Sequence, residues 1–210
     1  MDKLKLGLLL TSVSFLLAFL STLITVYFIN VALSIPPLNF SSPSAFINSL
    51  KSYLEGLILS YYYSTFPLLT AGFIIAVLGQ MISASGFSRN NMTLGFVTSI
   101  LGSLGGVLFL VAGLGISYII SLLVKTYLVI PAVLGLLGIF AYFLYVFTLN
   151  VLYGVQFIIS GSILSGILLI ACTIMQFINL HLLLTQTGQL LQLAIEFLLF
   201  LAYLLSVRKI

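Results

Sequence analysis

The chain has 210 residues, of which 62% are apolar and only 5% are charged, and its formal net charge is +4. This is too little charge to keep the surface of a soluble globular domain hydrated, so a soluble fold is excluded. A membrane span takes about 20 residues, so this length holds five to seven helices joined by short loops. The apolar runs predict an all-α polytopic integral membrane protein with six transmembrane helices in one compact bundle. We expect one transmembrane domain over 1–210 and the lipid bilayer as its main partner.

The first predicted span covers about 6–30 and is followed by the longest predicted loop, 35–55. Pro36 and Pro37 stop the first helix because proline lacks an amide hydrogen and restricts the residue before it. Within the loop, Ser42 precedes Pro43 and favours a short capped helix over 44–55. A plain solvated loop is the alternative.

The next two predicted spans are 56–82 and 93–124, separated by a loop over 83–91. The later span is rich in glycine, and small residues on one side of a helix allow a neighbouring backbone to approach closely. We therefore predict a helix-packing face along it, formed by Gly95, Gly102, Gly106 and Gly113.

The last three predicted spans are 128–149, 155–178 and 189–207. A short link over 150–154 separates the span 128–149 from the span 155–178. Within the span 155–178, Gly161 is predicted to be a helix-packing residue. The last span carries an acid, Glu196, near its centre. Its Leu, Ile, Phe and Val residues favour insertion by about 4 to 7 kcal/mol, which outweighs a cost of about 3 kcal/mol for one central acid.

The acid is expected to face protein and not lipid. At 100° per residue, polar and aromatic residues share one side of the last helix, and the opposite side is aliphatic. The members of this face are Gln189, Gln192, Glu196, Phe200 and Tyr203. Gln192 lies one turn before Glu196 and is placed to donate a hydrogen bond to its carboxyl group.

A short link joins the last two predicted spans, so these helices should pack antiparallel. With a rise of about 1.5 Å per residue, Cys172 should lie level with Gln192, and Gln176 with Gln189. We predict a polar seam between the two helices, with Glu196 near Leu169 and Ser165. The seam is interpreted either as hydrogen-bonded packing between helices or as a proton or cation site.

Orientation follows from the basic residues. With six spans, one side of the membrane carries Lys3, Lys5, Arg89, Arg208 and Lys209, and the other carries Lys51 and Lys125. The positive-inside rule then puts both termini in the cytoplasm and the loop 35–55 outside. The glycosylation triplet that begins at Asn39 lies in that outer loop.

No catalytic motif is evident. Ser162 or Ser165 with His181 is the nearest pair, but the histidine is predicted on the other side of its helix and no Gly-x-Ser-x-Gly pattern is present. One cysteine and one histidine offer no disulfide, metal cluster or haem pair. We expect no enzyme, no cofactor, no metal and no nucleic-acid partner.

Two functions remain. The first is an accessory or scaffold subunit of a membrane complex, bound to other membrane subunits or to a second copy of itself. The second is a small transporter or channel-like protein, or the substrate-binding membrane subunit of an importer. In that case the ion site consists of Glu196, Gln192, Gln189, Gln176 and Cys172.

Overall fold

The structure is a computed structural model that describes residues 2–33, 41–46, 48–49, 66–122, 147–179, 182 and 186–209. Within these ranges all regular secondary structure is helical, which confirms the predicted all-α class. The helices are α1 (Lys3–Leu33), α3 (Phe66–Arg89), α4 (Thr93–Leu122), a π-helix η1 (Phe147–Leu152), α6 (Tyr153–Ile159), α7 (Ile163–Asn179) and α8 (Gln186–Lys209).

Four of the described helices contain a segment that is long and apolar enough to cross a membrane: Lys3–Tyr27, Pro67–Arg89, Thr93–Val111 and Thr187–Lys209. Large apolar side chains are also exposed along α3, α4 and α7. Such extensive apolar exposure is unusual on a soluble monomer and suits contact with lipid. The protein is therefore membrane-embedded.

The count of six spans stays a prediction. Most of the predicted span 128–149 lies outside the described residues, as do the first ten residues of the predicted span 56–82. The short helix predicted over 44–55 is described only near its start. There the Ala45 amide donates to Ser42 Oγ at 3.1 Å, the expected capping contact.

Helix α3 is longer at its end than predicted, since it continues through Arg89 instead of ending at Ile82. A tight turn then leads into α4. Asn91 adopts a left-handed backbone conformation (φ 55°), and the Met92 amide donates to the Phe87 carbonyl at 2.9 Å. This is a Schellman motif with asparagine in the position that usually holds glycine.

The predicted uninterrupted helix over 155–178 is wrong. Gly161 has a φ of +83°, and the Ser162 amide donates to the Phe157 carbonyl at 2.8 Å, so a second Schellman motif ends α6 at Ile159. The chain reverses and α7 begins at Ile163. Ser160-Gly161-Ser162 is only a short polar break in a long, mainly apolar run, which is why hydropathy alone suggested one helix.

The prediction of a link over 150–154 is also wrong, because these residues are helical. Residues 147–152 form η1, which passes directly into α6. Helices α6 and α7 pack closely, because a Cβ atom added at Gly154 would lie 2.9 Å from the Gly166 carbonyl oxygen. The expected place of a link is thus part of a close helix–helix contact.

The predicted packing glycines have different surroundings. Gly95 and Gly102 in α4 lie against Phe87 and Gln80 of α3, and Gly106 is buried. Gly113 lies in α4, but its surroundings are outside the described side chains. Gly161 is a turn residue with nothing within 4 Å of an added Cβ, so the packing role predicted for it is wrong.

The glycines of α3 make close contacts that the sequence analysis missed. Gly72, Gly79 and Gly86 recur every seven residues and all face α1. Added Cβ atoms would lie 2.8 Å from the Gly7 carbonyl oxygen at position 79 and 2.6 Å from Leu4 Cα at position 86. The two helices therefore approach backbone to backbone.

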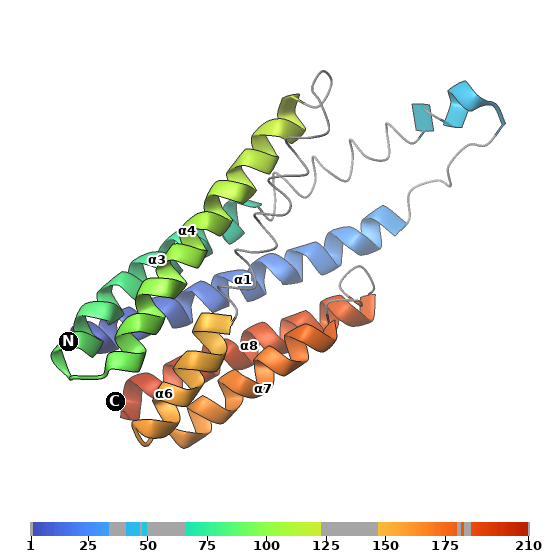
Figure 1. The fold of residues 1–210 in the computed structure, drawn as a ribbon. Helices are drawn as coiled ribbons and strands as arrows, with labels where there is room; N and C mark the ends of the chain where they lie inside the picture. Colours follow the sequence, from blue (N-terminus) through green and yellow to red (C-terminus); the bar gives the residue numbers. More distant parts are fainter. Residues whose placement is uncertain are drawn as a thin grey trace.

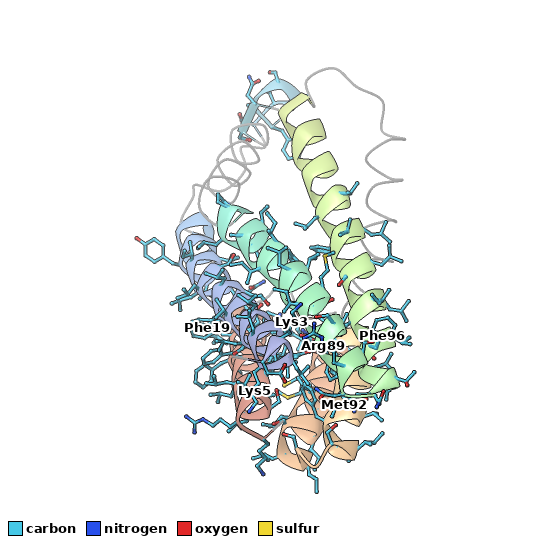
Figure 2. The ribbon with its side chains drawn as sticks, turned by 90° about the vertical axis from the view of Figure 1, so that its left-hand side faces the viewer. Lys3, Lys5, Phe19, Arg89, Met92 and Phe96 are labelled. Carbon is cyan, nitrogen blue, oxygen red and sulfur yellow. The ribbon has the colours of Figure 1, made fainter. Side chains whose placement is uncertain are left out.

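Helix α1 lies between α3 and α8, and α8 in turn packs on α7. Figure 1 shows both chain ends at the same end of the molecule, together with the α3–α4 and α6–α7 turns. Figure 2 shows Lys3, Lys5 and Arg89 towards this end. We call it the basic end, and the opposite end, where α7 leads into α8, the link end.

Candidate functional site: a buried carboxyl between α1 and α8

Glu196 lies near the middle of α8 and is only 6% exposed. Its Oε1 accepts two hydrogen bonds, from Gln192 Nε2 at 2.9 Å and from Thr22 Oγ1 at 3.0 Å. The donor from Gln192 is the one expected from the i, i+4 spacing. Thr22 belongs to α1, so the carboxyl group ties two helices together.

The second carboxyl oxygen is different. Glu196 Oε2 is buried and has no hydrogen-bond partner among the residues that the structure describes. An unsatisfied buried acceptor costs about 1 to 3 kcal/mol, more when it is charged. The arrangement satisfies half of the carboxyl group and leaves the other half for a proton, a water molecule or a cation.

Towards the link end, the hydrogen bonds continue across the α7–α8 contact. Asn179 Nδ2 donates to the Gly188 carbonyl at 3.0 Å and to Gln192 Oε1 at 3.3 Å. Gln192 therefore bridges Asn179 and Glu196. We call Asn179, Gln192 and Glu196 the polar line.

The predicted seam between α7 and α8 is present with different partners. Cys172 Sγ faces the Ile195 carbonyl at 3.9 Å and is not level with Gln192, so the register differs from the prediction by about three residues. The Glu196 carboxyl group is hydrogen-bonded to α1. No hydrogen bond is described between it and the part of α7 around Leu169 and Ser165, where it was predicted to lie. Gln189 lies on α8 and is partly exposed.

Gln176 belongs to a second buried group. Its Oε1 accepts from Asn150 Nδ2 at 3.1 Å, and Asn150 lies in the π-helix η1. Gln80 of α3 is fully buried near the same helix, since an added Cβ at Gly102 would meet both Gln80 and Leu149. Both amide atoms of Gln80, and Asn150 Oδ1, lack partners within the described part of the chain.

Between the polar line and the basic end lies a group of stacked and edge-on aromatic rings. Tyr203 stacks on Phe15 with ring centroids 5.5 Å apart, and it meets Tyr153 and Phe157 edge-on at 6.0 and 5.9 Å. All four residues are buried. We call Phe15, Tyr153, Phe157 and Tyr203 the ring cluster.

No family model, curated protein or solved structure matches this chain. The site must therefore be interpreted from its own chemistry.

The residues around Glu196 show what sequence reasoning missed. Thr22 is separated from Glu196 by 174 residues, and its only sequence signal is the recurrence of Ser and Thr along an otherwise apolar span. Asn179 lies at the end of α7, and its hydrogen bonds to the start of α8 depend on the register between the two helices. The sequence pattern argued against Ser162 or Ser165 with His181 as a catalytic pair. Ser162 Oγ donates to Ser165 Oγ at 3.0 Å, and His181 lies outside the described residues.

Proposed function

We propose that the protein is a small transporter or channel-like protein that binds a proton or a small monovalent cation at Glu196 within the membrane. The observation that supports this is the unpartnered Oε2 of a carboxyl group whose other oxygen holds two donors. Hydrogen-bonded packing alone explains Oε1. It gives no reason to leave the second oxygen buried without a donor.

The described part of α1 and α8 places no positive charge near Glu196, and this supports the same proposal. On α1 and α8, the nearest described basic residues in sequence are Lys5, 17 positions from Thr22, and Arg208, 12 positions from Glu196. At 1.5 Å per residue these positions are about 25 and 18 Å away along the helices. An isolated ionised carboxylate is very costly away from water, so the group needs a proton or a bound cation.

We further propose that the protein is a multi-pass protein of the cell membrane with both termini in the cytoplasm. The support is the gathering of five of its basic residues, Lys3, Lys5, Arg89, Arg208 and Lys209, near the basic end. The positive-inside rule assigns such an end to the cytoplasm. In this orientation the link end faces outward.

The test is ion movement by the purified protein in sealed vesicles that contain a pH-sensitive dye. Proton entry is driven by a potassium diffusion potential, with and without an opposing sodium gradient. We expect wild-type vesicles to change internal pH faster than protein-free vesicles, and we expect Glu196→Gln to reduce the rate at least about tenfold. Glutamine keeps the shape of the side chain but neither ionises nor releases a proton.

Ser206→Ala is the matched control. Ser206 is buried on the same helix, and its hydroxyl donates only locally, to the Tyr203 carbonyl at 2.6 Å. This variant should retain the wild-type rate. Wild-type vesicles that are no faster than empty ones under either gradient, or a folded Glu196→Gln protein with the wild-type rate, would overturn the proposal.

An accessory or scaffold subunit is the second candidate, and one face of α4 favours it. Five aliphatic side chains at heptad spacing are 43 to 53% exposed there: Val97, Ile100, Leu104, Val107 and Val111. This a/d pattern suits packing against another helix, from a second copy or from another subunit. Copurification in mild detergent tests it: Leu104→Ala with Val107→Ala should release the partner, and Ile167→Ala on α7 should not.

A further inference from the structure

The two sides of Glu196 along α8 differ in chemistry. Towards the link end, Gln192 follows after one turn, about 6 Å, and the Gly188 carbonyl with its Asn179 donor after two turns, about 12 Å. Towards the basic end, the ring cluster begins at Tyr203, about 10 Å from Glu196. Hydrogen-bonded polar side chains therefore lead from the carboxyl group towards the link end, whereas towards the basic end the described chain has the bond from Ser12 Oγ to the Phe200 carbonyl at 3.0 Å and then the ring cluster.

The polar side holds two buried acceptors that lack donors among the described residues, as Gln80 Oε1 and Asn150 Oδ1 do near η1. Asn179 is fully buried and its Oδ1 has no donor among the described residues, as is true of Glu196 Oε2. Gln192 bridges the two residues that carry these acceptors. Buried polar groups of this kind are ordinarily satisfied by ordered water, and each bound water needs two or more polar partners.

The ring cluster offers water no such partners. The hydroxyl of Tyr203 donates to the Leu149 carbonyl at 2.9 Å, and the hydroxyl of Tyr153 is hydrogen-bonded to Ser99. The rest of the cluster is aromatic carbon, with Tyr153 and Phe157 stacked at 5.8 Å between centroids. Water that entered here would lose hydrogen bonds without replacing them.

We infer that Glu196 exchanges its proton or cation with the aqueous phase only at the link end, along the polar line, and that the ring cluster closes the route to the basic end. The ligand named here rests on the proposed function, whereas the direction of access rests on the hydrogen bonds and rings alone.

The groups that face Glu196 are consistent with one-sided access. Helix α1 contributes Thr22, and α8 contributes Gln192. The titratable group of α7 is Cys172, which is directed to the Ile195 carbonyl. On these helices the basic residues near the basic end are separated from Glu196 by the ring cluster. No charged group of the described chain therefore lies on the polar side, where it could pair with the carboxyl group in place of water.

The experiment is cysteine labelling from one side at a time. The only native cysteine is removed as Cys172→Ala. A membrane-impermeant thiol reagent is then applied to intact cells and, separately, to inverted vesicles. Lys3→Cys reports the basic end and Leu182→Cys the link end. We expect Gln192→Cys to react from the side that labels Leu182→Cys, at least about tenfold faster than from the other side.

Asn179→Cys is the second variant, in case replacing Gln192 disturbs the fold, and it should react from the same side. Leu199→Cys is the control, because Leu199 is buried on α8 between Glu196 and Tyr203. It should stay unlabelled from the basic end. Reaction of positions 192 and 179 from the basic end, or from neither side, would overturn the inference.

The outcomes also separate the inference from the proposed function. Link-end labelling together with a Glu196→Gln protein that still conducts at the wild-type rate would retain the route and reject the ion site. Loss of conduction in Glu196→Gln together with labelling from the basic end would retain the ion site and reject the route.

Discussion

The contact between α1 and α3 makes a sharp prediction, because two glycines on one helix face differ only in the space beside them. Gly72 and Gly79 both lie in α3, both are buried and both face α1, one heptad apart. Replacing either by alanine adds one methyl group. Any gain in helix propensity is the same at both positions and cancels in the comparison.

The space available is not the same. An added Cβ at Gly79 would lie 2.8 Å from the Gly7 carbonyl oxygen and 2.9 Å from the Thr11 amide nitrogen, which are backbone atoms of α1. At Gly72 the nearest atom is the Ser14 carbonyl oxygen at 3.3 Å. Gly79→Ala must therefore push the two helices apart, whereas Gly72→Ala requires a shift of a few tenths of an ångström.

Overpacking of this kind costs about 1 to 3 kcal/mol. We expect Gly79→Ala to be less stable than Gly72→Ala by this amount. For a chain of this size, that corresponds to about 2–12 °C in the midpoint of thermal unfolding. The measurement is loss of helical circular dichroism on heating in a mild detergent. Equal midpoints for the two variants would refute the close approach of α1 and α3.

Two further predictions use the same unfolding assay. Thr22→Val removes one of the two donors to Glu196 and should cost about 0.5 to 1.5 kcal/mol. Thr25 is the control, because its hydroxyl donates to the Ser21 carbonyl of its own helix. Thr25→Val should cost less than Thr22→Val. Identical losses would mean that the bond to Glu196 contributes nothing. Gly161→Ala forces a residue with a Cβ into a left-handed conformation (φ +83°) and should cost about 1 to 2 kcal/mol. Gly161→Asn should recover part of that loss because asparagine tolerates this conformation, and no recovery would contradict the role given to the turn.

The sequence by itself determined those features that depend on composition and on neighbours along one helix. The scarcity of charge and the long apolar runs predicted an all-α, membrane-embedded chain, because the free energy of transfer into lipid is a sum over residues. The hydrogen bond from Gln192 to Glu196 was predictable because residues four apart meet on any α-helix.

Tertiary structure decided the rest. In a chain this apolar, lipid-facing and protein-facing sides of a helix have nearly the same composition, so periodicity does not identify the partner of each face. For this reason the bond from Thr22 to Glu196 and the close approach at Gly79 emerged only when α1 was placed between α3 and α8. The reversal at Gly161 was hidden for a related reason: both helices that it joins are apolar, and only the positive φ and the Ser162 hydrogen bond distinguish a turn from a continuing span.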